Sequence, residues 1–475
     1  MSFRDLRGWM EQVEKLGQLE AARGASWNLE IGAITELVFR QKNKPAVLFD
    51  EITDYQGAGR VLINSLGSND RMALTWGLPA GLSTMELKAK LAEKYQNLVP
   101  IKPMVVSDGP VMENVITGDA VDLFKFPTPL WHEDDGGRYI GTGSVDITID
   151  PDENWVNLGC YRVMIMDKNH AGFYISPGKH GRIHRTKYLS QNQPAPLAIS
   201  CGHEPLIFLL GAMEFPYGIS EYEWAGAILG QPMEVIKGPL TGLPIPASAE
   251  LVLEGFVAPG ETRMEGPFGE WTGYYASDTR PEPVIEVKAI YHRNNPIILG
   301  SPPSKPPNEH SLFRSMFRSI LIEDEMAKAG IPDVTGVWCH EAGGSRLFNV
   351  VAIKQRYPGH AKQAAMVATF CHAASYLGRF TVVVDDDIDI TDINEVIWAM
   401  CTRVDPVKDI DIIDGCLSGP LDPIIPVADK GHSSRAIINA CRPIQWIDSF
   451  PKVVGASPKL VEETVAKWKK LIYGG

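Results

Sequence analysis

The first hundred residues alternate between helix-like and strand-like hydrophobic patterns. Apolar residues recur at helical spacing from Phe3 to Leu16, with Ser2 placed to cap this helix and Gly17 placed to end it. Short apolar runs predict strands, and longer periodic stretches predict helices. The expected strands are 46–49 and 60–64, and the expected helices are around 30–40, 69–76 and 84–97. The pattern predicts an N-terminal α/β domain over residues 1–108.

The pattern changes between residues 109 and 305 to short β-branched runs separated by Gly, Pro, Asp and Asn. Such spacing is typical of an antiparallel sheet or barrel. The clearest runs are 143–149, 157–165 and 283–288. The apolar run Pro205–Leu210 is too short to span a bilayer and is expected as a buried strand.

Strands and helices alternate again after an extended, proline-rich junction at 302–307. A long helix is expected from Glu309 to Ala329, with Gly330 ending it. Ser457 and the proline after it predict the start of a last helix that Gly474 would end, and such a helix often docks on the preceding domain or on another subunit. The expected strands are 334–339, 348–353 and 380–384, and the expected helices are around 359–376 and 391–403. The linker helix and a C-terminal α/β domain would occupy residues 306–475.

Composition narrows the class of protein. Of 475 residues, 44% are hydrophobic and 22% charged, which is typical of globular domains and argues against disorder. The net charge of -13 disfavours nucleic acid as a partner. No apolar run could span a membrane and the N-terminus has no signal-peptide pattern, so we expect a cytoplasmic protein without a membrane partner. The seven cysteines are scattered without a CxxC pair, which argues against a disulfide framework or a zinc–thiolate site.

The most informative stretch is Glu265-Gly-Pro-Phe-Gly-Glu270, in which two carboxylates flank a turn. The glycines permit backbone angles that are closed to other residues, and the proline fixes its own φ. A strand leaving such a turn could direct both carboxylates into one cavity, where their pKa values would be driven apart. On this stretch alone, a hairpin tip with two solvated glutamates is the simpler interpretation, because charged residues are mostly exposed. Asp385, Asp386 and Asp387 are similarly interpreted as solvated acids in a loop at a strand end.

Three further polar residues are chemically suited to a divalent ion. Asn157, His180 and Glu221 offer the amide, imidazole and carboxylate groups that bind hard or borderline cations. Their spacing matches no short metal motif. If 157–165 is one regular strand, Asn157 and Arg162 point to opposite faces unless a twist or bulge intervenes. Each residue alone has an ordinary interpretation, as a solvated sheet face, a loop histidine or a first-turn helix acid.

Common nucleotide and hydrolase motifs are missing from the sequence. Gly141-Thr-Gly143 lacks the following helix that a dinucleotide-binding fingerprint requires. There is no Walker A motif and no GxSxG elbow. Classical nucleotide-binding and serine-hydrolase interpretations are therefore disfavoured.

Taken together and in order, several segments resemble the UbiD family of prenylated-flavin-dependent decarboxylases, over nearly the whole chain. The most specific segments are Asn157-x-Gly-x-Tyr-Arg162, Pro177-Gly-Lys-His180, Ser220-Glu221-Tyr-x-x-Ala-Gly226, Glu265-Gly-Pro-Phe-Gly-Glu270-x-Thr-Gly-Tyr-Tyr275, the run 382–390 and the run 396–406. The resemblance implies an N-terminal α/β domain, a central split β-barrel like that of flavin reductases, and a C-terminal α/β domain joined by a long helix. It also reverses the simpler interpretation of the two glutamates.

The resemblance further implies site residues and cofactors. Arg162, Glu265 and Glu270 would form the catalytic network. Asn157, His180 and Glu221 would hold Mn²⁺ or Mg²⁺ against the phosphate of prenylated FMN, with K⁺ nearby. The implied cofactor-binding residues are Asn157, Tyr161, Arg162, Lys179, His180, Glu221 and Arg435. Arg435 stands where family members often have a lysine, and arginine keeps the charge with a different geometry.

The implied function is reversible, non-oxidative decarboxylation of an aromatic, heteroaromatic or α,β-unsaturated acid, with Glu270 as the proton donor. A flavin prenyltransferase would supply the cofactor, and the chain would form homodimers or homohexamers. An FMN-dependent oxidoreductase on the same barrel and a non-catalytic subunit of a larger carboxylase remain as alternatives. The substrate is not readable, although Asn308, His310 and His432 are polar candidates for its pocket.

Overall fold

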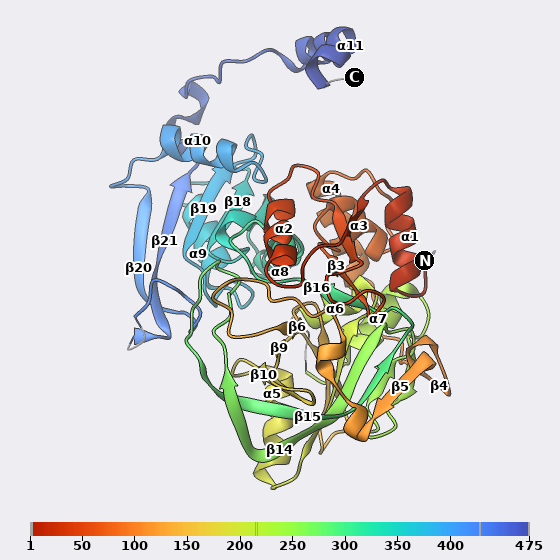
Figure 1. Ribbon diagram of the computed structural model, residues 1–475. Helices are drawn as coiled ribbons and strands as arrows, with labels where there is room; N and C mark the ends of the chain where they lie inside the picture. The colour runs from red at the N-terminus through yellow and green to blue at the C-terminus, as the bar shows by residue number, and fades with distance from the viewer. Residues whose placement is uncertain (1–2, 214, 216, 427–428, 474–475) are drawn as a thin grey trace.

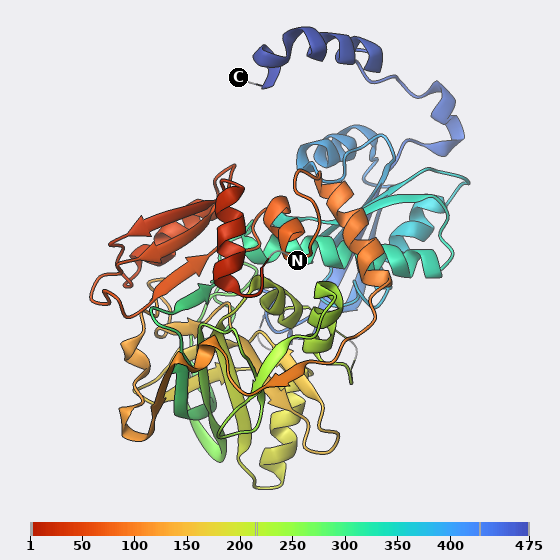
Figure 2. The same cartoon turned by 90° about the vertical axis from the view of Figure 1, so that its right-hand side faces the viewer.

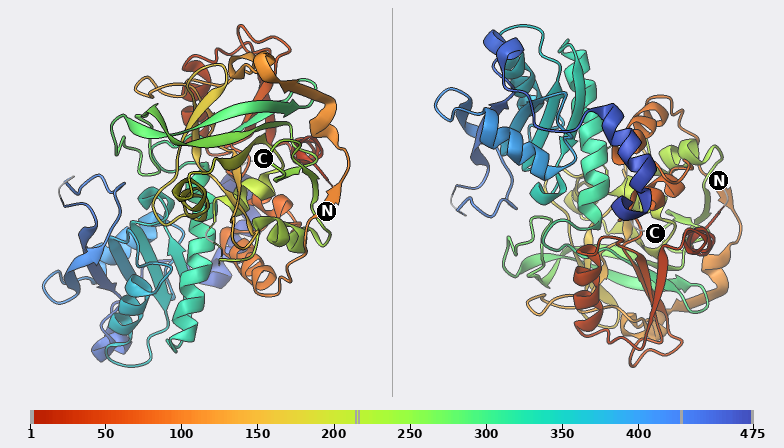
Figure 3. Two further views of the ribbon diagram at one scale, coloured as in Figure 1. Left: turned by 90° about the horizontal axis from the view of Figure 1, so that it is seen from below. Right: turned by 90° about the horizontal axis from the view of Figure 1, so that it is seen from above.

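The computed structural model describes residues 3–213, 215, 217–426 and 429–473 (Figure 1). An N-terminal α/β unit and a C-terminal α/β unit lie above a strongly curved antiparallel sheet. Seen from below, helix α8 (Glu309–Lys328) runs along the boundary between the C-terminal unit and the rest of the molecule (Figure 3). Within the described ranges, no helix is both long enough and apolar enough to cross a membrane.

The N-terminal unit contains a sheet with the strand order β1-β2-β3-β16. Strand β16 comes from the end of the central region and pairs in parallel with β3, so the two units share this sheet. The strands are β1 (Leu19–Arg23), β2 (Ala46–Asp50), β3 (Arg60–Ile63) and β16 (Ile297–Gly300), and the helices are α1 (Leu6–Lys15), α2 (Glu30–Phe39), α3 (Asn69–Thr75) and α4 (Thr84–Gln96). The elements that the hydrophobic pattern predicts in this region are confirmed.

Helix α1 begins later than the sequence predicts. Its first residue is Leu6, and the Asp5 side chain accepts a hydrogen bond from the Gly8 N–H at 2.8 Å, as an N-cap does. Ser2, the predicted cap, lies outside the described residues. Phe3 is buried in the core ahead of the helix, so its apolar character reflects packing and not a place on the helical stripe.

The central unit is one antiparallel sheet that curls into a split barrel. Its strand order is β6-β9-β10-β15-β14-β11-β7-β8, with β5 paired to β15. The strands are β5 (Asn114–Thr117), β6 (Tyr139–Gly141), β7 (Val145–Ile149), β8 (Val156–Gly159), β9 (Arg162–Ile165), β10 (His170–Tyr174), β11 (Ala195–Gly202), β14 (Leu251–Glu265) and β15 (Arg280–His292). A small sheet of β4 (Met104–Val106), β12 (Glu234–Lys237) and β13 (Pro244–Pro246) flanks it. The helices here are α5 (His180–Ser190), α6 (Pro205–Gly211) and α7 (Glu221–Leu229).

The predicted strand at Pro205–Leu210 is wrong, because this run forms helix α6. All of these residues are buried, so the run has no polar face and carries no periodicity that could separate strand from helix. Pro205 occupies the first helical turn, where its missing N–H and fixed φ are tolerated. The proline was therefore a helix-start signal.

The C-terminal unit has a mixed sheet with the order β17-β18-β19-β21-β20. Its strands are β17 (Val334–Cys339), β18 (Phe348–Ile353), β19 (Phe380–Asp385), β20 (Ile410–Leu417) and β21 (His432–Ala440), and its helices are α9 (His360–Phe370) and α10 (Ile393–Arg403). Helix α9 ends earlier than predicted, since Cys371 turns to an extended conformation. One hydrophobic cluster spans the three units, and Trp9, Phe208, Phe313 and Trp338 all belong to it.

The last helix, α11 (Pro458–Tyr473), extends away from the body of the molecule (Figures 1 and 2). The Ser457 hydroxyl accepts a hydrogen bond from the Leu460 N–H at 3.3 Å, so the predicted cap is confirmed. Gly474, the predicted end, lies outside the described residues. Several large apolar side chains on α11 are exposed, including Val461 at 48% and Trp468 at 50%. An exposed apolar stripe of this kind is typical of a surface that another chain covers.

Candidate active site at the end of the split barrel

The Glu265–Glu270 stretch lies in the loop that joins the two longest strands, β14 and β15. Glu265 is the last residue of β14 and is paired with Arg280 at the start of β15. Gly266 has φ +87°, a left-handed conformation that glycine adopts without strain. The Glu270 N–H then donates to the Tyr274 carbonyl at 3.0 Å, which closes a turn and returns the Glu270 carboxylate toward the barrel.

Arg162, the first residue of β9, lies between the two carboxylates. Its Nε and Nη2 donate to the two oxygens of Glu265 at 3.0 and 2.8 Å, while its Nη1 donates to Glu270 Oε1 at 2.9 Å. The side chain of Glu265 is fully buried, and that of Glu270 is 14% exposed. The two glutamates are therefore unequal, since Glu265 engages the guanidinium through both oxygens and Glu270 through one.

A second layer of side chains fixes this arrangement. The Tyr139 hydroxyl donates to Glu265 Oε1 at 2.8 Å, and its ring stacks on Phe268 with ring centroids 3.8 Å apart. The Arg162 guanidinium lies 4.9 Å from the centre of the Tyr174 ring. Neither tyrosine was expected from the sequence, because nothing local connects these residues to a turn more than ninety positions further along the chain.

The environment of Glu270 favours its protonated form near neutral pH. Burial raises the pKa of its carboxyl to about 7, against the opposing positive charges of Arg162, Arg280 and Arg314. Arg314 belongs to α8, so the linker helix contributes charge to a site that is otherwise built on the barrel. A carboxyl group with a pKa near the working pH can both hold and release a proton.

Asn157 and Arg162 lie on separate strands, so they do not alternate along one regular strand as the sequence pattern suggested. Strand β8 ends at Gly159 and β9 begins at Arg162, so Cys160 and Tyr161 form a link outside the strand ladder. The Cys160 N–H donates to the Gly211 carbonyl at 3.0 Å, and the Tyr161 N–H donates to Asp146 Oδ2 at 3.0 Å. The alternation of a single regular strand therefore does not apply between Asn157 and Arg162.

The three predicted metal ligands gather around β8. Asn157 is a buried residue of this strand, and the next residue, Leu158, donates its N–H to Glu221 Oε2 at 2.7 Å. His180 is the first residue of α5, a helix that packs on β7 and β8, and its ring meets the Trp155 ring edge-on at 4.8 Å. Among the described residues no group of three or more His, Cys, Asp or Glu side chains is arranged to hold a metal ion, and the third member of the predicted set is an asparagine.

Glu221 is the residue of this set whose electrostatics are most informative. Burial raises the pKa of its carboxyl to about 8, and hydrogen bonds from the backbone N–H groups of Leu158 and Glu221 act in the other direction. A buried carboxylate without a cation is costly, and a bound cation would remove that cost. The donor set and the missing positive charge both fit a divalent ion.

Tyr161 and Lys179 lie beside this cluster. The Tyr161 ring is packed so closely between Gly159 and Gly181 that a Cβ on either glycine would approach it to 2.3 and 2.7 Å. Its hydroxyl accepts a hydrogen bond from the Gly181 N–H at 3.2 Å. Lys179 is the N-cap residue of α5 and is half-buried. Tyr161 therefore joins the β8–β9 link to the start of the helix that carries His180.

The predicted phosphate contact of Arg435 is not supported. This residue is buried in β21, where its guanidinium donates to the carbonyls of Thr369, Ala374, Ser375 and Leu417, all in the C-terminal unit. These bonds join β21 to helix α9, to the segment that follows α9, and to the neighbouring strand β20. Arg435 is thus a structural residue here, and the similarity of its local sequence to the lysine-containing family motif does not extend to its contacts.

The other polar candidates have mixed outcomes. Asp386 and Asp387 are exposed as predicted, but Asp385 is buried, where Arg403 and Arg442 bond its carboxylate. His432 is exposed on β21. Asn308 and His310 are structural at the start of α8: Asn308 is the N-cap, and the His310 ring contacts Ser301 with Nε2 3.1 Å from the serine hydroxyl.

The chain matches family models along most of its length. Residues 10–91, 104–306 and 311–440 match the N-terminal, Rift-related and C-terminal domains of 3-octaprenyl-4-hydroxybenzoate carboxy-lyase. The pyrrole-2-carboxylic acid decarboxylase of Pseudomonas aeruginosa is 34% identical over 464 residues, which cover 94% of this chain and 92% of that protein. The chain belongs to the UbiD family.

Solved structures of UbiD-class enzymes share its whole architecture. The vanillic acid decarboxylase of Sedimentibacter hydroxybenzoicus in its open form is 31% identical, with a TM-score of 0.86 over 99% of this chain and 100% of that one. The UbiD-class enzyme HmfF of Pelotomaculum thermopropionicum, in complex with FMN, is 29% identical, with a TM-score of 0.86 over 98% of this chain and 100% of that one. The three-unit fold with a split barrel is therefore confirmed, and this chain is a carboxy-lyase of the UbiD family.

Proposed function

We propose that this chain releases CO₂ from a small aromatic or heteroaromatic acid with prenylated FMN as its cofactor, and that Glu270 delivers the replacing proton. The observation that carries the proposal is the Arg162 guanidinium held between two carboxylates, which it bonds unequally. Glu265 bonds Arg162 through both oxygens and so orients it. Glu270 bonds through one oxygen and has a pKa of about 7.

The residues have distinct parts in the proposed reaction. Loss of CO₂ from an sp² carbon leaves an electron pair that no side chain can accept, and prenylated FMN would supply that electron sink when bound. Arg162 would orient the substrate carboxylate, since a guanidinium presents planar donors that match it. Protonated Glu270 would then place its proton on the carbon that has lost CO₂, a contribution of roughly 10²–10⁴-fold in rate.

Asn157, His180 and Glu221 would hold a divalent ion, Mn²⁺ or Mg²⁺, against the flavin phosphate. The support is the donor set around β8 and the pKa of Glu221, which burial raises to about 8 in the absence of a cation. Lys179 would add positive charge beside the phosphate, with K⁺ as an expected second cation. The ion's part would be to neutralise phosphate and anchor the cofactor.

The substrate and cofactor can be tested together. The protein would be coexpressed with a flavin prenyltransferase and assayed with pyrrole-2-carboxylic acid, vanillic acid and cinnamic acid. The first two are the acids named for its relatives. We expect CO₂ release, and ring deuteration in D₂O, from at least one heteroaromatic or aromatic acid. Protein made without the prenyltransferase is the control and should be inactive.

One result would contradict the proposal and favour the oxidoreductase alternative. It is NAD(P)H oxidation by protein that carries plain FMN, with no CO₂ release from any acid in either preparation. Absorbance and mass of the extracted flavin identify which cofactor each preparation contains.

We also infer that α11 packs on another copy of this chain. Its apolar stripe includes Val461, Val465 and Trp468 at helical spacing, and the helix stands away from its own body (Figure 2). Val465→Asp should lower the mass measured by light scattering to that of a smaller assembly, with a preserved fold by circular dichroism. Ala466→Asp adds the same charge beside the stripe and should leave the mass unchanged. Equal masses for the wild type and both variants would refute the inference.

A further inference from the structure

Asp146 of strand β7 is a buried acid that the proposed reaction does not use. Its side chain is fully buried, and its cross-strand neighbour on β8 is Gly159. Oδ2 accepts the hydrogen bond from the Tyr161 N–H at 3.0 Å. Oδ1 has no hydrogen-bond partner among the described residues, and burial raises the pKa of the group well above its ordinary value. Asp146 is thus placed to act through a neutral hydrogen bond.

The hydrogen bond from the Tyr161 N–H to Asp146 lies in the short link between strands β8 and β9. The link of Cys160 and Tyr161 separates the strand that carries Asn157 from the strand that begins with Arg162. Because the link leaves the ladder, its two N–H groups need acceptors elsewhere. The Gly211 carbonyl serves Cys160, and Asp146 serves Tyr161. Removing the Asp146 acceptor would leave the part-buried Tyr161 N–H without its hydrogen-bond partner, so we expect the link to shift.

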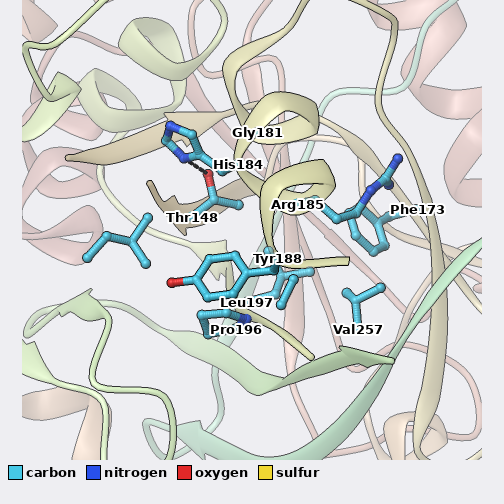
Figure 4. Close-up of a pocket in the computed structure, with 11 residues that line it drawn as sticks. Thr148, Phe173, Gly181, His184, Arg185, Tyr188, Pro196, Leu197 and Val257 are labelled. Atoms are coloured by element: carbon cyan, nitrogen blue, oxygen red, sulfur yellow. Dashed lines mark hydrogen bonds between the residues drawn. The ribbon is translucent and has the colours of Figure 1, made fainter. Parts of the chain in front are cut away.

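A shift of Tyr161 would be transmitted to helix α5. The Tyr161 ring fills the space between Gly159 and Gly181, and its hydroxyl accepts the Gly181 N–H. Gly181 follows His180 at the start of α5. On the same face of β7 as Asp146, the Thr148 hydroxyl lies 3.1 Å from His184 Nδ1 on the next turn of α5 (Figure 4). The polar face of β7 therefore sets both the link and the helix above it.

We propose that Asp146 is a positioning residue that holds the Cys160–Tyr161 link and thereby fixes Arg162 relative to Asn157 and His180. The proposal rests on the function proposed for these residues. Asp146 is hydrogen-bonded to the Tyr161 N–H, and it is through this bond that it would act on the site. Its role is to accept one hydrogen bond, which an uncharged amide of the same shape can also do.

The test compares Asp146→Leu, which removes the acceptor, with Asp146→Asn, which keeps one. Ile147→Val, on the opposite face of the same strand, controls for a general loss of strand packing. Three measurements are made on each full-length variant: amide hydrogen exchange of the peptide with Tyr161, FMN affinity by fluorescence titration, and kcat per bound prenylated flavin. We expect Asp146→Leu to expose the Tyr161 amide to exchange, weaken FMN binding and lower kcat by about 10²-fold, as misplacement by ~1 Å can do.

Asp146→Asn should restore amide protection, FMN affinity and kcat to within a few-fold of wild type, and Ile147→Val should match wild type in all three. The proposal is overturned if Asp146→Leu keeps Tyr161 protected, or if Asp146→Asn is as impaired as Asp146→Leu. Amide exchange and FMN affinity need no substrate. An inactive wild type would therefore count against the proposed reaction, while these two measurements would still decide the role of Asp146.

Discussion

Replacing Glu270 with glutamine is expected to abolish turnover while the flavin and metal stay bound. The amide can still accept the hydrogen bond from Arg162 Nη1, so the local geometry should survive. It cannot deliver a proton, and loss of a positioned donor costs roughly 10²–10⁴-fold in rate. The measurements are kcat for CO₂ release and the incorporation of deuterium into product in D₂O, with flavin content read from absorbance.

The pH dependence of the wild-type rate provides a second test of Glu270 as the proton donor. The pKa of Glu270 is raised to about 7, so the carboxyl is protonated and competent as an acid below that pH. The rate of the protonation step should therefore be flat below pH 7 and fall as pH rises through it, if Glu270 is the donor. A profile that rises through pH 7 would assign the opposite role, a base.

Glu270→Asp provides a control that keeps the acid but shortens the side chain. We expect partial activity with deuterium incorporation, because the acid remains but stands further from Arg162 and the substrate. Glu270→Gln with full activity and full deuteration would show that another group delivers the proton. Loss of flavin from Glu270→Gln would mean that the residue supports binding instead.

The hydrophobic pattern was sufficient for most of the fold, and its errors have identifiable causes. Runs with a polar face were assigned correctly to helix or strand, because the spacing of their apolar residues shows which side packs against the core. Pro205–Leu210 is buried on all sides, so it has no polar face from which a helical or strand period could be read. Asp385 looked solvated because its partners, Arg403 and Arg442, are separated from it in sequence and meet it only after the sheet forms.

The site residues also differ in whether the sequence alone could identify them. Arg162, Glu265 and Glu270 were identified by their similarity to family motifs, and the geometry brings them within hydrogen-bond distance. Tyr139, Arg314 and Asp146 have no local motif, since their roles come from contacts that tertiary structure creates. The phosphate contact expected of Arg435 stays a prediction. Its motif resembled the family pattern, but its charge is used by carbonyls within its own unit.

Replacing Glu221 with alanine is expected to remove metal and flavin together. Glu221 is the only carboxylate among the three proposed ligands, so it would supply the ligand set's negative charge. Changes to residues that merely support metal ligands already cost about 10–100-fold in affinity, and removal of a ligand should cost more. Metal content by mass spectrometry and FMN affinity by fluorescence titration measure the two losses. Glu223→Ala, on the same helix, controls for removal of an acid from α7.

Glu221→Gln separates ligand charge from fold stability. The glutamine keeps an acceptor for the Leu158 N–H, which alanine would leave buried and unsatisfied. In metal-free protein the folded pKa of Glu221, about 8, exceeds its ordinary 4.5, so the folded state binds more protons than the unfolded state between these values. The stability of the metal-free wild type should therefore decrease as pH rises from 4.5 toward 8, and Glu221→Gln should decrease less.

Added Mn²⁺ should reverse this trend in the wild type, because a cation favours the ionised carboxylate and binding to the folded state adds stability. Chemical denaturation of metal-free and Mn²⁺-loaded protein at pH 5 and pH 8 gives the four free energies of unfolding needed. The Glu221→Gln variant should gain much less from Mn²⁺ at pH 8. Equal gains in the two proteins, or retention of metal and flavin by Glu221→Ala, would exclude Glu221 as a ligand and leave its buried carboxyl as a structural acid.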